Sequence, residues 1–312
     1  MKVLIPGGSG QVGTILARAF VAGGHEVTIL SRGPALGPWR LLPWDARTLG
    51  SWQGAVDAAD VVINLAGRNV NCRYTAANRA DILNSRVEST RVIGEAIAQS
   101  PTPPRLWLQA STATIYRHTF DSPNDESGVI GGSEPDVPRS WDFSITVARA
   151  WEQALSDADT PRTRKVAMRS AMVMSPDKGG IFYTLATLAR LGLGGRAGSG
   201  RQYVSWIHER DFVRAVQWLI DSSEVSGWVN IAAPNPLPYA DFMRGLREAL
   251  GNRIGLPATE WMLSLGAWFM GTETELVLKS RRVVPGRLLQ EGFIFEFPTW
   301  APAAADLVRQ SA

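Results

Sequence analysis

Short apolar runs alternate with helical repeats along the first part of the chain. Lys2–Pro6 is such a run, and apolar residues then recur at helical spacing until Gly23 and Gly24 end the repeat. The next apolar run, Glu26–Leu30, follows at once. This order predicts a strand, a helix and a second strand at the start of the chain.

The same alternation continues to about residue 175. Further strands are expected over Val61–Leu65, Leu106–Gln109 and Lys165–Met174, with helices over about Ala76–Gln99 and Phe143–Ser156 and a loop over Gly33–Gly50. Strands that alternate with helices are typical of a parallel sheet with right-handed crossovers and helices on both faces. The predicted fold class is therefore α/β, a Rossmann-type doubly wound parallel sheet.

The pattern changes near residue 176. Leu191–Gly200 is rich in glycine and Pro234–Pro238 in proline, and helices are expected around 240–250 and 258–270. We expect residues 1–175 to form a nucleotide-binding domain and residues 176–312 to form a smaller C-terminal α/β lobe on the substrate side. Some later segments are expected to return to the sheet.

Composition narrows the class of protein. Hydrophobic residues make up 45% of the chain and charged residues 20%, so it can build a sizeable core. The net charge is only +3, which does not imply a nucleic-acid partner. The longest apolar stretch, Trp261–Met270, is about half the roughly 20 residues that a membrane span requires, so no membrane partner is expected.

Cysteine and histidine usage excludes several kinds of site. Cys72 is the only cysteine, which rules out an intrachain disulfide and a cysteine-based zinc cage. The histidines at 25, 118 and 208 show no ligand spacing, so no metal site is predicted. The N-terminal run lacks the apolar core of a secretion signal, and we expect a cytoplasmic protein.

A glycine-rich turn joins the first strand to the first helix. Its glycines follow the spacing Gly7-x-x-Gly10-x-x-Gly13, with Ser9, Gln11 and Val12 between them. Glycine lets the backbone approach a pyrophosphate, and the helix N-terminus supplies unpaired N–H groups and partial positive charge. The strand, turn and helix together predict a dinucleotide site.

The end of the second strand carries Ser31 and Arg32. Sites for NAD usually place a carboxylate there to bind the ribose 2′-hydroxyl, whereas a guanidinium and a hydroxyl suit a 2′-phosphate. The expected cofactor is therefore NADP(H). The alternative is that Arg32 is a solvated loop residue.

These segments resemble the extended short-chain dehydrogenase/reductases, which include nucleotide-sugar epimerases. The resemblance is strongest to an atypical branch known as epimerase family proteins, whose C-terminal segment is a domain of unknown function. The residues that carry it are Asn64–Gly67, Ser85–Val87, Ser111–Tyr116, Gly192–Gly195, Ser205–His208, Arg282–Pro285 and Gly292–Phe295.

The resemblance implies a set of cofactor-binding residues beyond the glycine turn. They are Ser31, Arg32, Leu65, Ala66, Gly67, Asp81, Arg86 and Val173. Arg86 suits a phosphate or a ribose, although a surface cation of the long helix is the alternative.

The catalytic pattern of the wider superfamily is incomplete. Its members use a tyrosine and a lysine four residues later for proton transfer, with a Ser or Thr that binds the substrate oxygen. Thr112 stands where the hydroxyl is expected, but Ser144 and Ala148 occupy the other two positions. Thr112 and Tyr116 remain the candidate catalytic residues, with a packing role as the alternative for Tyr116.

Two further segments have open interpretations. Asp211 is expected to cap a helix over Phe212–Ile220, and His208 either packs there or contacts a substrate. The glycine-rich run with Arg190, Arg196 and Arg201 either closes over an anionic substrate or forms a mobile surface loop.

Two functions fit these features. The first is an oxidoreductase-like or epimerase-like enzyme that uses NADP(H) on an unknown small molecule, and we prefer it because the loops at the substrate face are polar and glycine-rich. The second is a non-catalytic NADP(H) sensor or scaffold, since Ser144 and Ala148 replace the catalytic pair.

Overall fold

The computed structural model describes residues 1–132, 134, 137–258 and 275–311. Its centre is a seven-stranded sheet in the order β10-β6-β5-β4-β1-β2-β3. All neighbouring strands in this sheet are parallel. These strands are β1 (Lys2–Pro6), β2 (Glu26–Ser31), β3 (Arg40–Pro43), β4 (Val61–Asn64), β5 (Leu106–Thr112), β6 (Arg164–Ser170) and β10 (Gly227–Ile231).

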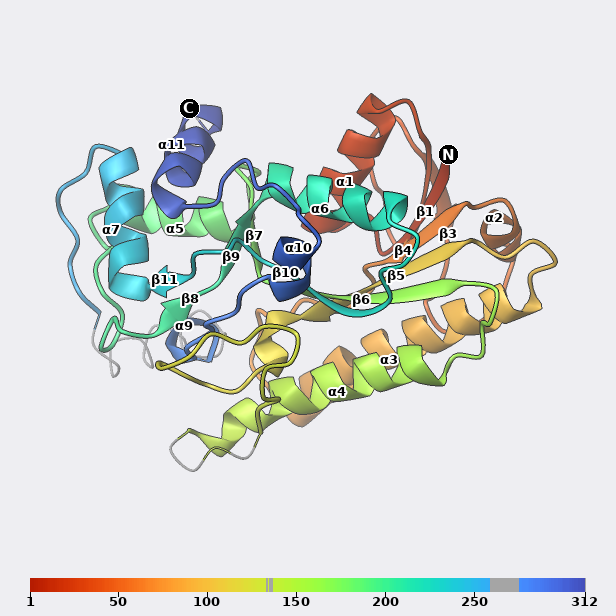
Figure 1. Cartoon of the computed structure of the whole chain (residues 1–312), viewed down its shortest axis with the longest axis horizontal. Coiled ribbons are helices and arrows are strands. Elements are labelled where there is room, and N and C mark those ends of the chain that lie inside the picture. Colours follow the sequence, from red (N-terminus) through yellow and green to blue (C-terminus); the bar gives the residue numbers. More distant parts are fainter. Residues whose placement is uncertain (133, 135–136, 259–274, 312) are drawn as a thin grey trace.

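Helices cover both faces of this sheet, as Figure 1 shows. Apolar residues of α1 (Gln11–Ala22) and α6 (Glu209–Asp221) pack with Val3 and Ile5 on one face. Residues of α2 (Gln53–Asp57), α3 (Ala76–Gln99) and α4 (Asp142–Asp157) pack with Leu4 on the other. Alternate residues of β1 therefore serve opposite cores, as the pleat of a strand requires.

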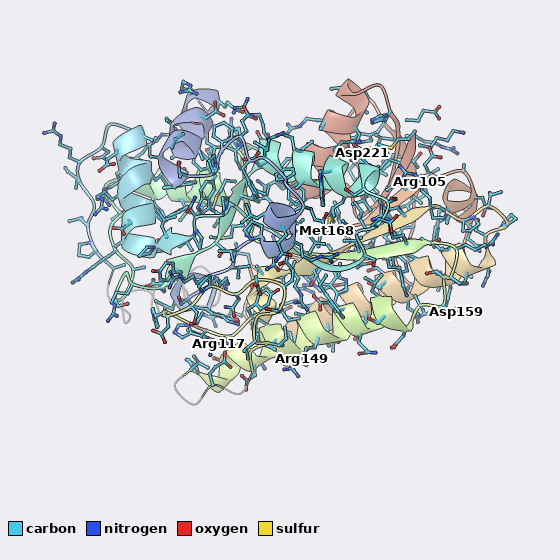
Figure 2. All side chains as sticks on the ribbon, viewed as in Figure 1. Arg105, Arg117, Arg149, Asp159, Met168 and Asp221 are labelled. Carbon is cyan, nitrogen blue, oxygen red and sulfur yellow. The ribbon has the colours of Figure 1, made fainter. Side chains whose placement is uncertain are left out.

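The predicted Rossmann-type architecture is confirmed. Successive strands extend from β1 in both directions, so the connection reverses between β1 and β4, and ligands of open α/β sheets bind at such a point. Met168 of β6, labelled in Figure 2, has no exposed surface and belongs to the same apolar core as Val3 and Ile5. The strand β10 comes from beyond residue 175 and pairs with β6.

A second group of elements lies beside the sheet and has its own core. It contains β7 (Met172–Met174), α5 (Ile181–Arg190), β8 (Tyr203–Val204), β9 (Trp206–His208), β11 (Leu237–Pro238), α7 (Tyr239–Ala249) and α11 (Trp300–Gln310). Two short sheets, β11 with β8 and β7 with β9, belong to this group. The boundary at residue 175 stays a prediction.

Four short elements complete the described chain. They are η1 (Ala113–Ile115), η2 (Arg139–Trp141), α9 (Glu275–Leu278) and α10 (Gly286–Gln290). The helix expected around 258–270 falls, apart from its first residue, outside the described residues.

Two strand predictions were wrong. The stretch Gly33–Gly50 was expected to be a loop, but it contains the edge strand β3, whose mostly exposed residues and terminal proline do not give the apolar run of a buried strand. The single strand expected over Lys165–Met174 is two strands. It breaks at Ala171, whose N–H donates to Ile231, and β7 then pairs with β9 in another sheet.

The expected cap of α6 was also wrong. Its N-cap is His208, whose Nδ1 accepts from the Arg210 N–H at 3.1 Å. Asp211 lies inside the helix with no exposed surface, and its carboxylate accepts the N–H groups of Glu296 and Phe297 at 2.8 and 2.7 Å. This carboxylate therefore anchors the segment that leads to α11 rather than the helix start.

Candidate nucleotide site

The glycine turn is held closely against the neighbouring strand β4. Gly7 has φ +75°, and a Cβ there would lie 2.6 Å from the backbone of Ala66. A Cβ at Gly13 would lie 2.4 Å from Gly8, so α1 begins in tight contact with the turn. Only glycine satisfies both demands, and the turn brings the start of α1 beside the ends of β1 and β4.

The start of α1 leaves room and free donors. Gly10 is the N-cap and provides no side-chain hydrogen bond, and a Cβ added there would meet only the Gly7 oxygen, at 3.7 Å. The first N–H groups of a helix lack intrahelical acceptors and carry partial positive charge. This turn therefore has the chemistry of an anion cradle.

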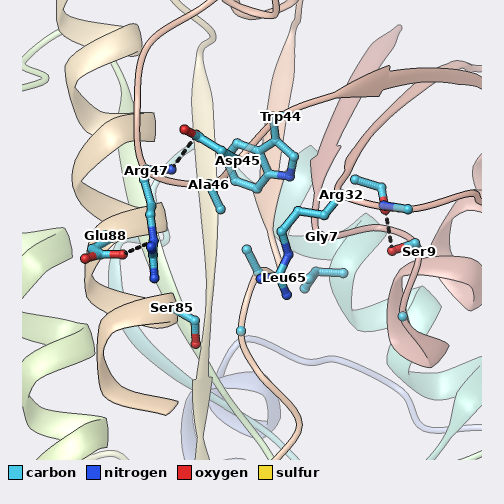
Figure 3. Close-up of a pocket in the computed structure, with 15 residues that line it drawn as sticks. Gly7, Ser9, Arg32, Trp44, Asp45, Ala46, Arg47, Leu65, Ser85 and Glu88 are labelled. Atoms are coloured by element: carbon cyan, nitrogen blue, oxygen red, sulfur yellow. Dashed lines mark hydrogen bonds and ion pairs between the residues drawn. The ribbon is translucent and has the colours of Figure 1, made fainter. Parts of the chain in front are cut away.

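A cavity of about 300 Å³ opens in front of this turn (Figure 3). Eight of the predicted cofactor residues line it: Gly7, Ser9, Gly10, Ser31, Arg32, Leu65, Ala66 and Gly67. Seven further residues line it that were not expected from the sequence: Gly33, Trp44, Asp45, Ala46, Arg47, Ser85 and Glu88. Most of these residues follow the edge strand β3. Because that strand was not predicted, this wall of the cavity was not predicted either.

Ser31 and Arg32 line the cavity at the end of β2. The Ser31 hydroxyl donates to Ser9 Oγ at 2.8 Å and accepts from the Gly33 N–H at 3.2 Å, which ties the end of β2 to the glycine turn. Arg32 is exposed, and among the described residues its guanidinium has no hydrogen-bond or ion-pair partner. It is therefore free to bind an anion.

Arg47 adds a second guanidinium to the cavity wall. Its Nε lies 2.7 Å from a carboxylate oxygen of Glu88 on α3, as Figure 3 shows. The nearby Asp45 already has hydrogen-bond partners in its own turn, since Thr48 and the Arg47 N–H donate to its carboxylate. These hydrogen bonds lower the pKa of Asp45 to about 2. The cavity wall thus combines two cations with carboxylates that already have partners.

The remaining cofactor predictions lie off the cavity lining. Asp81 forms an ion pair with Arg68 on the exposed side of α3. Val173 is buried in the core that contains Val3 and Ile5, and Val12 packs against the same core. The amide nitrogen of Gln11 is buried and has no hydrogen-bond partner among the described residues, and a Cβ at Gly180 would lie 2.1 Å from it. Their roles toward a cofactor remain predictions.

Arg86 lies behind the cavity wall. Its Nη1 donates to the carbonyls of Arg68 and Ile82 at 3.0 Å, and a Cβ at Gly67 would lie 3.1 Å from its guanidinium carbon. Burial lowers the pKa of Arg86 to about 10, so it stays charged at neutral pH. It therefore supports the loop after β4, whose residues Leu65–Gly67 line the cavity.

The two candidate catalytic residues differ in accessibility. Thr112 ends β5 half-buried, and its hydroxyl accepts from the Thr114 N–H at 3.1 Å. Tyr116 is only 2% exposed. Its hydroxyl accepts from Arg169 at 2.9 Å and donates to Asn230 at 2.8 Å, and burial raises its pKa. These contacts support the packing alternative for Tyr116, while Thr112 lies at the carboxyl end of β5 and stays a prediction.

The positions of the missing catalytic pair have other uses. Ser144 is half-buried and donates to Glu275 at 2.7 Å. Ala148 has no exposed surface and packs with Ala113, Ile115 and Val283, so a lysine there would displace core residues. A phenol and an amine in the family arrangement are therefore replaced by a polar contact and a packed methyl group.

The described part of the chain holds no group of three or more His, Cys, Asp or Glu side chains arranged for a metal ion. Nor does any helix in the described ranges have the length and apolar character to cross a membrane.

The fold and site define a nicotinamide-nucleotide-type Rossmann protein, and the family follows from comparison. The model of the NAD dependent epimerase/dehydratase family matches residues 3–232, and a domain of unknown function, DUF1731, matches residues 258–307. The chain belongs to this epimerase/dehydratase family. The resemblance inferred from the sequence is thereby confirmed.

Full-length relatives share both parts of the chain. The bovine epimerase family protein SDR39U1 is 33% identical over 312 residues, covering 99% of this chain and all of the relative. The crystal structure of human SDR39U1 (isoform 2), solved with NADPH, is 30% identical with a TM-score of 0.85 and 99% coverage of both chains. A nucleoside-diphosphate sugar epimerase from Corynebacterium glutamicum is 27% identical with a TM-score of 0.76, covering 98% of this chain and 57% of its own.

Proposed function

We propose that this protein binds NADP(H) in the cavity in front of the glycine turn and uses it in an oxidoreductase-like or epimerase-like reaction on a small molecule. The observation that carries the proposal is that one cavity contains both the glycine turn and the free guanidinium of Arg32. Helix-terminal amides suit a pyrophosphate, and a guanidinium suits a ribose 2′-phosphate. The relative solved with NADPH supports the same cofactor.

Each group in the cavity has an assigned task in this proposal. The turn Gly7–Gly13 binds the pyrophosphate, and Ser31 orients the end of β2. Arg32 binds the 2′-phosphate, with Arg47 as a second cation on the same wall. The cofactor, when bound, supplies or accepts a hydride. Thr112 remains the proposed residue for holding the substrate oxygen.

A non-catalytic sensor is the second candidate. It is favoured by the contacts of Ser144 and Ala148, which leave no phenol and amine in the family arrangement. A sensor should respond to the redox state of the nucleotide without consuming it. Hydrogen exchange of the protein with NADP⁺ and with NADPH would show such a response as different protection in the second lobe.

Calorimetry on the purified chain tests the cofactor proposal. NADPH should bind about tenfold to a hundredfold more tightly than NADH, since a charge-assisted contact contributes about 1.5–3 kcal/mol. Equal affinity for the two, or no heat with either, would overturn it. A panel of carbonyl and sugar compounds then separates the two functions: oxidation of bound NADPH, or epimerisation of a compound without net oxidation, supports the enzyme, whereas tight binding with neither result favours the sensor.

A further inference from the structure

A second cavity lies in the smaller lobe, away from the proposed nucleotide cavity. Its volume is about 50 Å³, well above the roughly 10–15 Å³ that one ordered water requires. Apolar residues of α5 and α7, including Leu185 and Phe242, form much of its wall. Lys279 and Arg281, just after α9, line the same cavity.

Lys279 is a buried ammonium group whose charge is only partly compensated. The residue is 3% exposed, its Nζ donates to the Thr114 carbonyl at 2.9 Å, and a Glu275 carboxylate oxygen lies at 3.7 Å. Burial lowers the pKa of Lys279 to about 8 even though Glu275 acts in the opposite direction. An anion entering the cavity would restore part of the lost solvation.

Arg281 places a second cation against the same cavity. Its Nε donates to the Thr114 hydroxyl at 3.2 Å and its Nη2 to the Glu275 carbonyl at 3.2 Å. Burial also lowers its pKa. Lys279 and Arg281 therefore line the cavity together, and Glu275 contacts both of them.

The pair is fixed to the substrate edge of the central sheet. Thr114, which contacts both cations, lies two residues beyond Thr112 at the end of β5, and the Thr112 hydroxyl accepts its N–H. The cavity also borders Met172, next to Val173 of β7. In open α/β sheets, ligands bind beyond the carboxyl ends of such strands.

We propose that this cavity binds the carboxylate end of a small, otherwise apolar substrate, with Lys279 and Arg281 as its anion-binding residues. An apolar cavity with a few convergent polar groups is the usual form of a small-molecule site. A guanidinium and an ammonium at one wall suit a carboxylate, and the apolar residues of α5 and α7 suit a short hydrocarbon chain. The assignment of this carboxylate compound as the substrate rests on the proposed function; its binding does not.

Lysine NMR provides a direct test, because the chain has only four lysines, Lys2, Lys165, Lys178 and Lys279. With ¹³C-labelled lysine and butanoate as the probe, the Lys279 signal should shift saturably and its pKa should rise. The signal of Lys165, which donates to the carbonyls of Leu155 and Ala158 away from the cavity, should not move. No shift of Lys279, or equal shifts with butanamide or inorganic phosphate, would overturn the proposal.

The pH dependence follows from the charge of Lys279. Butanoate should bind best below about pH 8 and lose affinity as the ammonium deprotonates above it. The groups that act on Lys279 are Glu275 and Arg281 nearby in sequence, with Glu134 and His118 facing it from other segments. Affinity that rises above pH 8 would contradict the assignment.

Substitution completes the test. Lys279→Met should weaken butanoate binding about tenfold or more, whereas Lys165→Met should leave it unchanged. If Lys279→Met does not fold, Lys279→Arg is the alternative variant. It keeps a cation and should retain part of the butanoate binding. NADPH binding, measured on the same samples, is the independent readout. If the unmodified protein does not bind NADPH, the proposed function is wrong. If it binds NADPH but not butanoate, only this inference is wrong.

Discussion

Ser144 of α4 donates a hydrogen bond of 2.7 Å to the Glu275 carboxylate, 131 residues further along the chain. By resemblance to the short-chain dehydrogenase/reductases, Ser144 stands at the position of their catalytic tyrosine. The C-terminal segment therefore reaches the place that the phenol would occupy. The same segment brings Lys279 and Arg281 to Thr114, just after β5, so it contacts both the Ser144 position and the residues beyond β5.

Arg32→Asp should remove the preference for NADPH over NADH. The change removes the guanidinium assigned to the 2′-phosphate and puts a carboxylate where NAD sites commonly have one. We expect NADPH affinity to fall about tenfold to a hundredfold, from a lost contact of about 1.5–3 kcal/mol, and NADH affinity to change little. Calorimetry with both nucleotides measures this. Arg40→Asp, an exposed arginine on β3 outside the cavity, is the control, and equal losses with both nucleotides would refute the assignment.

Gly7→Ala should disrupt the turn itself. The residue has φ +75° and its added Cβ would lie 2.6 Å from the Ala66 backbone, so both strain and overlap oppose the change. Gly24→Ala is the matched control, since Gly24 has φ +77° but nothing within 4 Å of an added Cβ. The control should cost about 1–2 kcal/mol by conformation alone. Urea unfolding should show a larger loss for Gly7→Ala, together with lost NADPH binding.

The nucleotide turn was predictable because its signal is local. Three signals stand next to one another in the sequence: an apolar run for the strand, the glycine spacing for a close backbone approach, and a helical repeat for the helix. The opposite wall is different. Arg47 and Trp44 reach the cavity through β3, an edge strand with little burial to leave an apolar pattern.

Long-range contacts were the least predictable part of the site. Asp211 looked like a helix cap because an acidic residue precedes an apolar repeat, yet its partners are the backbone of Glu296 and Phe297. Lys279 is a second case, since it is only 3% exposed. Its burial depends on Thr114, 165 positions earlier, and no local pattern encodes such a pairing.

Tyr116→Phe should reduce stability, because the tyrosine hydroxyl joins two buried groups. Its removal leaves Asn230 Oδ1 and one Arg169 donor without this partner, at a cost of about 1–3 kcal/mol. Tyr183→Phe, on an exposed face of α5, should have little effect on the free energy of unfolding. A Tyr116→Phe protein that is as stable as the control variant and loses only turnover would show that the hydroxyl acts in catalysis instead.

His208 should make the protein sensitive to acid. It has no exposed surface, stacks on Phe297 and lies 3.2 Å from an Asp306 carboxylate oxygen. Burial lowers its pKa to about 4, below the value of about 6.5 for an unfolded histidine. The unfolded state therefore binds the proton first, so this contribution to stability is complete above about pH 6.5 and is lost as the pH falls toward 4.

The size of this effect is measurable by urea unfolding at several pH values. The difference between the unfolded and folded pKa of His208 corresponds to a loss of as much as about 3 kcal/mol in the free energy of unfolding between pH 6.5 and 4. His208→Asn retains a side chain that caps helices but does not titrate, so its stability should fall less between pH 6.5 and 4 than that of the unmodified protein. Glu209 and His118 also have shifted pKa values, but they are present in both proteins and cancel in the comparison. Parallel pH profiles for the two proteins would show that His208 does not take up a proton on unfolding.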